Sequence, residues 1–368
     1  MPIDSPMNRR DFLARAGAAS TSLMVPSLTS LLRADAGRAG WRTFEVRTQI
    51  EVLKHAKASR VWAPAALLVE TPYQKTLSNT FQAAGGAARL VKSPADGLGI
   101  VAAEFAAGVR PVLTVISRVA TRDYSVDLAG PHKAAGLSHA ERQHYTRPTR
   151  LLPTDGIVKD TAAEITKGAR TDLHKARAIY EWIVENTFRD PQTRGCGIGN
   201  IRFMLESRDL GGKCADLNAL YVGLARASGL PARDVYGIRV APSGLGYKSL
   251  GASSPDITRA QHCRAEVYIQ DLGWVPVDPA DVRKVVLEEP PGHRPLSDPM
   301  VKAARIRLFG SWEMNWIAYN FAHDVALPGS DRAPAAFLMY PQAETGGERL
   351  DSLDPENFRY TITSQRIS

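Results

Sequence analysis

The stretch Gly-Gly-Lys-Cys-Ala-Asp-Leu-Asn-Ala-Leu, residues 211–220, indicates how the central part of this chain folds. Apolar side chains continue at helical spacing to Ala227, and Gly229 followed by Pro231 is typical of a helix end. Cys214 therefore lies in the first turn of a predicted helix. Because a helix N-terminus carries unpaired N–H groups and a partial positive charge, it lowers the pKa of a thiol placed there.

The residues next to Cys214 also suit a nucleophile. Lys213 adds positive charge, and the double glycine before it lets the backbone turn sharply and a substrate approach closely. Gly212 is therefore a candidate substrate-binding position, and the backbone N–H of Cys214 is a candidate oxyanion donor. The alternative is a cysteine that is simply part of the core, which is less common at a polar helix start.

Two segments downstream supply a base and a group to orient it. Residues 262–270 alternate strictly as a strand, which places His262 and Cys263 on opposite faces, and residues 273–278 form a second strand that ends at Asp278. Antiparallel pairing brings the ends of the two strands together, so we predict His262 as base and Asp278 as orienter. The alternatives are a surface histidine and a turn-forming aspartate before proline.

The register of this hairpin determines whether Asp278 reaches His262. A plain hairpin centred on residues 270–273 sets Asp278 nearer Ala265 than His262, so we expect a bulge or stagger, with Pro276 as one place for it. Trp274 shares a strand face with Asp278, which makes it a candidate wall of a substrate groove, with a core position as the equal alternative.

The remaining cysteines have plainer interpretations. Cys196 lies in the glycine-rich loop before the predicted helix and is interpreted as incidental, with a second reactive thiol as the alternative. Cys263 is expected in the core. A disulfide between Cys196 and Cys263 stays open, because spacing in sequence does not test the required geometry. Three cysteines form neither a disulfide scaffold nor a zinc pattern.

Four segments taken together resemble the transglutaminase-like superfamily: residues 211–220, 229–233, 261–266 and 273–279. The resemblance implies an α+β fold with a papain-like core, in which the cysteine-bearing helix packs on an antiparallel sheet. It implies Cys214, His262 and Asp278 as a catalytic triad. It also implies acyl transfer or hydrolysis of peptide or amide bonds through a thioester. Because the family includes cross-linking enzymes, peptidases, amidases and inactive members, the triad does not fix the reaction.

Two departures from the animal cross-linking enzymes narrow this expectation. The sequence has no acidic loop suited to calcium, and the remaining length does not fit their appended sandwich domains. Both points favour a bacterial cysteine peptidase or amidase type. We expect no cofactor and no metal.

The rest of the chain is divided by pattern. Alternating segments at residues 44–52, 59–62 and 111–119 predict a small β domain, of sandwich type, over residues 37–130, and this region resembles the β domain preceding the core in many bacterial members. Residues 131–150 are polar and aperiodic, so we predict a linker. The transglutaminase-like core is expected over residues 151–290, and further strands or a packed extension over residues 291–368.

The first 36 residues are interpreted as an export signal. Arg9 and Arg10 precede Phe-Leu, a weakly apolar stretch follows, and Ala-Asp-Ala at 34–36 is a small-residue cleavage pattern. The paired arginines indicate a twin-arginine-type signal peptide, and hence a periplasmic or secreted protein. An amphipathic N-terminal helix is the alternative. No apolar run reaches the ~20 residues of a membrane span, so no integral membrane segment is expected after leader removal.

Composition limits the partners. The chain has 368 residues, 44% hydrophobic and 23% charged, which is typical of a soluble globular protein. The net charge of +8 is spread along the chain, so it favours acidic partners or surfaces but does not indicate nucleic acid. We expect a protein or peptide substrate. A non-catalytic binding module or an envelope structural protein of the same fold remains the alternative, and the oligomeric state stays open.

Overall fold

Strand β1 (Arg42–Val52) follows from the alternation predicted there, since Phe44, Val46 and Ile50 are buried on one face. The computed structural model describes residues 40–130 and 133–368, so the predicted signal peptide lies outside the described residues. Within them, Gly40–Ser368 forms one unit. No helix in this part of the chain is both long and apolar enough to cross a membrane.

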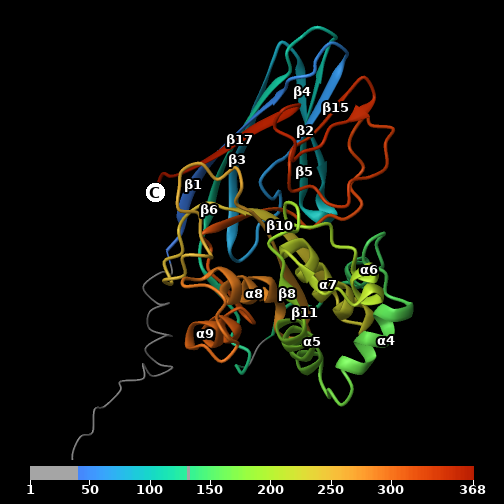
Figure 1. Cartoon of the computed structure of the whole chain (residues 1–368), viewed down its shortest axis with the longest axis vertical. Coiled ribbons are helices and arrows are strands. Elements are labelled where there is room, and N and C mark those ends of the chain that lie inside the picture. The colour runs from blue at the N-terminus through green and yellow to red at the C-terminus, as the bar shows by residue number, and fades with distance from the viewer. Residues whose placement is uncertain (1–39, 131–132) are drawn as a thin grey trace, which may run out of the picture. The chain divides into compact units, whose positions relative to one another are not determined.

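Two antiparallel sheets form a β-sandwich (Figure 1). The first has the order β17-β1-β6-β3. The second has the order β16-β15-β2-β5-β4. Their bounds are β2 (Ser59–Pro64), β3 (Gln74–Ala84), β4 (Ala87–Ser93), β5 (Leu98–Phe105), β6 (Val112–Thr121), β15 (Gln342–Thr345), β16 (Glu348–Arg349) and β17 (Phe358–Arg366). Apolar residues of both sheets, such as Ile50, Val101 and Phe358, share one core.

The sandwich therefore combines strands from both ends of the chain. Strand β17 pairs with β1 along its length, from Phe44 opposite Arg366 to Val52 opposite Phe358. Strand β15 pairs with β2 in the second sheet. The C-terminal segment, predicted as further strands or a packed extension, thus supplies strands to both sheets that the early strands begin.

The second half of the fold is a four-stranded antiparallel sheet covered by helices. Its order is β12-β11-β10-β14. The strands are β10 (Ala232–Arg239), β11 (Gln261–Ile269), β12 (Gly273–Val277) and β14 (Trp316–Asn320). Helix α7 (Cys214–Ala227) packs on this sheet, and residues from Cys214 to Arg226 are all buried. The predicted α+β core, with a cysteine-bearing helix on an antiparallel sheet, is confirmed.

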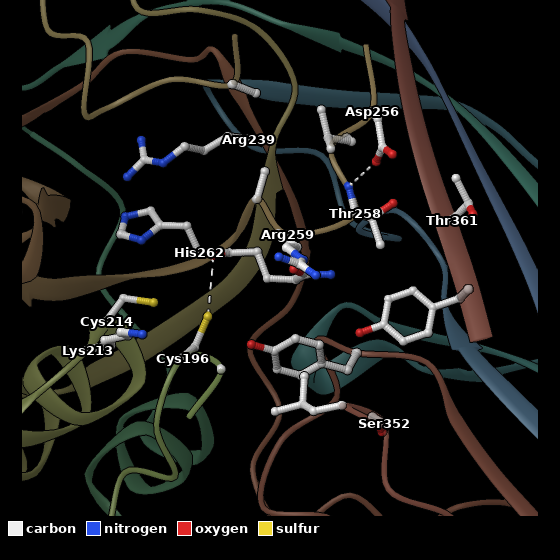
Figure 2. Close-up of a pocket in the computed structure, with 18 of the residues that line it drawn as sticks. Cys196, Lys213, Cys214, Arg239, Asp256, Thr258, Arg259, His262, Ser352 and Thr361 are labelled. Carbon is white, nitrogen blue, oxygen red and sulfur yellow. Dashed lines mark hydrogen bonds between the residues drawn. The ribbon is translucent and has the colours of Figure 1, made fainter. Parts of the chain in front are cut away.

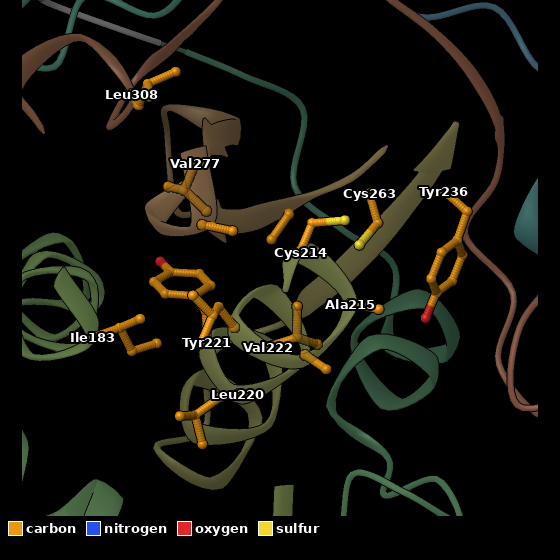
Figure 3. Packing of buried hydrophobic residues seen from close by; sticks show 14 of the residues in the cluster. Ile183, Cys214, Ala215, Leu220, Tyr221, Val222, Tyr236, Cys263, Val277 and Leu308 are labelled. Carbon is orange, nitrogen blue, oxygen red and sulfur yellow. The ribbon is translucent and has the colours of Figure 1, made fainter. Parts of the chain in front are cut away.

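Helices α4 (Gly156–Ile165) and α5 (Asp172–Asn186) pack against α7. Figure 3 shows apolar side chains such as Ile183, Leu220 and Val277 filling the space around α7. Thr171 caps α5, because its side chain accepts a hydrogen bond from the N–H of His174. The remaining elements are η1 (Pro94–Asp96), β7 (Tyr124–Ser125), β8 (Phe188–Arg189), α6 (Ile201–Ser207), β9 (Gly211–Gly212), α8 (Pro279–Glu288), α9 (Pro299–Arg307) and β13 (Ser311–Trp312).

The polar segment predicted as a linker contains a helix, α3 (His139–Thr146). Ser138 and Glu141 form a reciprocal capping box at its start, and Tyr145 is buried. The helix has little apolar periodicity, which is why pattern alone did not indicate it. The Ser-x-x-Glu signature of the capping box was the available signal.

Candidate active site

The first turn of α7 is held by the carboxylate of Asp216. Its Oδ2 atom accepts the N–H of Lys213 at 3.0 Å, and Oδ1 accepts the N–H groups of Ile198 and Gly199 at 3.0 and 2.9 Å. Burial raises the pKa of Asp216, although these three backbone bonds oppose the shift. Asp216 therefore ties the loop before the helix to the turn that carries Cys214.

Gly212 has a packing reason to be glycine. A Cβ at this position would lie 2.6 Å from the Cβ of Asp216, so a side chain here would displace the capping carboxylate. Gly212 is buried and is not among the residues that line the cavity beside Cys214. The structure thus places this candidate substrate-binding residue beneath the site.

His262 and Asp278 meet directly. The Nε2–H of His262 donates to Oδ2 of Asp278 at 2.8 Å, with both side chains buried. The expected bulge is absent from the β11–β12 ladder, whose regular register pairs Ala265 with Val277. Asp278 therefore follows the strand at a position opposite Arg264, which shares a face with His262, and a diagonal neighbour on one face is within side-chain reach.

Asp278 is fixed from two further directions. It is the N-cap of α8, and its Oδ1 atom accepts the N–H of Asp281 at 3.0 Å. Asn218 donates to the same oxygen at 3.3 Å and to the carbonyl of Cys263 at 2.8 Å. Since Asn218 follows Cys214 by four residues, it lies on the same face of α7. One helix face thus carries both the thiol and a group that orients the carboxylate.

A second carboxylate reaches the same imidazole. Oδ1 of Asp281 lies 3.4 Å from Nε2 of His262 and 2.6 Å from Nη2 of Arg239. Burial alone would lower the pKa of His262, but the charge of Asp281, followed by that of Asp278, raises it to about 9. Arg239 in turn holds the pKa of Asp281 well below its usual range despite burial. An imidazolium is therefore stable here at neutral pH.

The three cysteines gather around Cys214, and all three are free thiols. Hydrogen bonds from Cys196 and then Cys263 lower the pKa of Cys214 well below its usual range, with a further contribution from His262, against the effect of burial. The pKa values of Cys196 and Cys263 are raised, so both remain proton donors. The Cys196 thiol has two acceptors within reach, the Cys214 sulfur and the Gln261 carbonyl at 3.3 Å. This arrangement favours a Cys214 thiolate beside a His262 imidazolium.

A cavity of about 1110 Å³ opens beside these groups. Figure 2 shows Cys196, Cys214 and His262 along one part of its wall. Most of the remaining wall comes from the loop before β11 and from the C-terminal segment that includes Tyr340 and Tyr360, with basic side chains such as Arg189, Arg239 and Lys284 beside them. The thiol and the imidazole thus border a space large enough for a peptide segment.

Trp274 lies elsewhere. Its ring stacks under the guanidinium of Arg233 at 4.0 Å and meets the ring of Tyr145 edge-on at 4.9 Å. It does not line the cavity. Trp274 does share the predicted strand face with Asp278, but it stands four residues away, where helix α3 and Phe321 cover the face.

One group of side chains has the ligand types of a metal site. Ligand atoms of His262, Asp278 and Asp281 lie within 4.8 Å of one another. Two guanidiniums already supply positive charge to this group: Arg239 to Asp281 at 2.6 Å and Arg264 to Asp278 at 3.6 Å. A cation bound here would face both of them, so the donor set fits a proton-transfer site better than a metal site.

Comparison with known proteins bears directly on this part of the chain. Residues 159–279, which include Cys214, His262 and Asp278, match the model of the Transglutaminase-like superfamily. These residues therefore carry a transglutaminase-like core. An uncharacterized protein of Haemophilus influenzae is 41% identical over 234 residues, which are 61% of this chain and 63% of the relative, so the match spans less than two thirds of that relative's length.

Solved structures similar to this chain are remote in sequence. One is a candidate cysteine protease from Cytophaga hutchinsonii, with a TM-score of 0.49 and 14% identity, covering 89% of this chain and 98% of that chain. Another is the periplasmic domain of TgpA from Pseudomonas aeruginosa, with a TM-score of 0.33 and 16% identity, covering 69% of this chain and 91% of that chain.

Proposed function

We propose that this transglutaminase-like protein is a cysteine-dependent enzyme that cleaves or transfers peptide or amide bonds, with Cys214 as nucleophile, His262 as general acid and base, and Asp278 as orienter. The observation that carries the proposal is the buried Cys214, its pKa lowered, beside an imidazole held by a carboxylate at 2.8 Å. This combination is what nucleophilic acyl transfer requires.

The proposed reaction has two halves. The Cys214 thiolate attacks the carbonyl carbon, the C–N bond breaks, and the leaving amine takes the proton of the His262 imidazolium. A thioester to Cys214 remains. Neutral His262 then takes a proton from water or from a second amine, which attacks the thioester and restores the thiolate and the imidazolium. The backbone N–H of Cys214, at the helix N-terminus, is the proposed donor to the oxyanion.

The first test is selective alkylation of the purified protein with limiting iodoacetamide from pH 5 to 9, read by mass spectrometry. We expect Cys214 to react ahead of Cys196, with an apparent pKa well below the ~8.5 of a free thiol. A His262→Ala variant should raise that pKa. Equal labelling of Cys214 and Cys196 that ignores His262 would refute the catalytic proposal and favour a non-catalytic binding or envelope structural protein.

Whether water or an amine completes the reaction is a separate question. Substrate screens with and without a primary amine acceptor would separate hydrolysis from transfer. The amine adduct appears as a mass increase on the acyl product only if transfer occurs.

We also propose that the protein acts in the periplasm or outside the cell. The support is the Arg9-Arg10 pair and the following leader pattern. Fractionation of cells that produce the full chain, beside an Arg9→Lys/Arg10→Lys variant, tests this. The variant should accumulate in the cytoplasm, and equal distribution of both chains would contradict a twin-arginine signal.

A further inference from the structure

The cavity beside Cys214 is strongly unbalanced in charge. Seven arginine and lysine side chains line it besides His262, against one acidic side chain, Asp256, among its described lining residues. Four of the seven have carboxylate partners: Arg189 and Lys284 share Glu288, Arg194 pairs with Asp351, and Arg239 pairs with Asp281.

The other three cations are Lys213, Arg259 and Arg359. Within residues 40–130 and 133–368, none of them forms an ion pair with a carboxylate, although Glu51 lies opposite Arg359 in the β1–β17 register. Arg259 exerts a charge effect on Asp256, whose carboxylate also accepts the N–H of Thr258 at 2.9 Å. The cavity thus keeps more positive charge than its own carboxylates compensate.

These three cations line the same cavity as the reactive groups and come from separate segments. Lys213 directly precedes Cys214. Arg259 stands three residues before His262, and Figure 2 shows its guanidinium among the side chains that line the cavity. Arg359 comes from β17 of the sandwich. Because the cations come from three elements and share one cavity with Cys214, an anion bound among them would occupy the same space that the thiol borders.

We propose that this cavity selects an acidic peptide, whose side-chain carboxylates bind Arg259 and Arg359 while the bond to be cleaved lies over Cys214. Arginine suits this role because its planar guanidinium matches a carboxylate with two hydrogen bonds. The inference rests on the proposed function for the peptide nature of the substrate. It extends that function by naming the charge class, because a neutral peptide would leave Arg259 and Arg359, both exposed on the cavity wall, without a carboxylate partner.

Direct binding tests the charge class without turnover. In a Cys214→Ala background, fluorescence anisotropy would compare two rhodamine-labelled pentapeptides, Gly-Glu-Ala-Glu-Gly and its Gly-Gln-Ala-Gln-Gly analogue. We expect the Glu peptide to bind about tenfold more tightly at low salt, with the preference falling as salt rises. Added Arg259→Gln and Arg359→Gln substitutions should remove the preference. Equal affinities, or a preference that survives both substitutions, would overturn the inference.

A matched control removes one charge far from the cavity. Arg89 on β4 is exposed and is not part of the lining, so Arg89→Gln should leave the preference intact. If Arg89→Gln weakens binding as much as Arg259→Gln, the effect is one of net charge, and the cavity is not a specific site.

A second readout keeps failure of this inference distinct from failure of the proposed function. In the chain with Cys214 intact, the rate of alkylation by anionic iodoacetate is divided by the rate of alkylation by neutral iodoacetamide. We expect the ratio to fall several-fold in Arg259→Gln and to stay constant in Arg89→Gln. A Cys214 that reacts fast with both reagents at an unchanged ratio preserves the nucleophile and refutes the anion site. A Cys214 that is inert to both refutes the nucleophile, and peptide binding alone then decides the anion site.

Discussion

Asp281 lies 3.4 Å from Nε2 of His262, so a second carboxylate shares the nitrogen that Asp278 contacts at 2.8 Å. Asp281 is also the ion-pair partner of Arg239. Two buried carboxylates and two guanidiniums therefore set the charge of a single imidazole. The protonated form of His262 is therefore stabilised by the surrounding charges as well as by one hydrogen bond.

Asp281→Asn should lower the pKa of His262 from about 9, because the charge of Asp281 is the largest factor that raises it. We therefore expect neutral imidazole at a lower pH than in the unmodified chain. NMR titration of the labelled His262 ring measures this directly. Asp160→Asn, an exposed change on α4, is the control. An unchanged His262 pKa would show that Asp278 alone sets it.

Stability should depend on pH through His262. The folded pKa of about 9 lies above the ordinary value of 6.5, so its stabilising contribution is complete below pH 6.5 and is lost as pH rises through 9. The difference corresponds to about 3 kcal/mol. Urea denaturation of Cys214→Ala and of Cys214→Ala/His262→Gln from pH 6 to 10 isolates this effect. The gap in unfolding free energy between the two should narrow with pH, and a constant gap would argue against the raised pKa.

Cys196→Ala should raise the pKa of Cys214, because the Cys196 thiol gives the largest contribution that lowers it. Cys196→Ser keeps a hydroxyl donor and should restore much of the effect. The pH dependence of Cys214 alkylation distinguishes the three chains. If Ala and Ser variants behave alike and match the unmodified chain, Cys196 is incidental to Cys214.

Gly197→Ala should destabilise the site loop far more than Gly168→Ala. Both glycines have left-handed φ values, +91° and +83°, so both substitutions carry similar backbone strain. A Cβ at Gly197 would lie 1.8 Å from Oδ2 of Asp216, whereas at Gly168 no atom lies within 4 Å. We expect Gly168→Ala to cost about 1 kcal/mol and Gly197→Ala at least 2 kcal/mol more. Similar denaturation midpoints would show that the Asp216 carboxylate moves freely.

Trp274→Leu should lower stability and leave the reactivity of Cys214 unchanged. The substitution removes the stacking of Arg233 at 4.0 Å and the edge contact with Tyr145. The expected cost is about 1–2 kcal/mol, because the ring is only half-buried. Denaturation and Cys214 alkylation rates are the two measurements. Slower alkylation of Cys214 at unchanged stability would support the hypothesis that Trp274 forms a wall of the substrate groove.

Strong local signals allowed much of the central fold to be predicted from sequence. The start of α7 at Cys214 and the alternation from His262 gave the helix and strand that carry the site, and the structure has both. The register was harder. In the structure Ala265 pairs with Val277, one position away from the register of a plain hairpin, so Asp278 reaches His262 without a bulge. Turn geometry sets such a shift, and the turn sequence alone did not specify it.

The sequence did not reveal the residues that hold the site in place through contacts between distant segments. Asp216, Asn218 and Asp281 gain their roles only when loop, helix and strand meet. Their spacing gave partial signals, since Asn218 follows Cys214 by four residues and Asp281 follows Asp278 by three. Strands β3, β4 and β5 were not predicted individually: β3 is long but mostly polar, β4 has no fully buried residue, and β5 is a continuous buried run without alternation.

The pairing of β1 with β17 has a consequence for the order of events during synthesis. Val52 meets Phe358, so the edge of β1 that β17 covers stays open until almost the whole described chain has been made. Arg359 and Tyr360, which line the cavity, belong to that late strand. A growing chain that already contains Cys214 and His262 therefore lacks one wall of the cavity beside them. The fold thus completes the cavity only when synthesis reaches β17, whereas the groups that lower the pKa of Cys214 are already present in the growing chain.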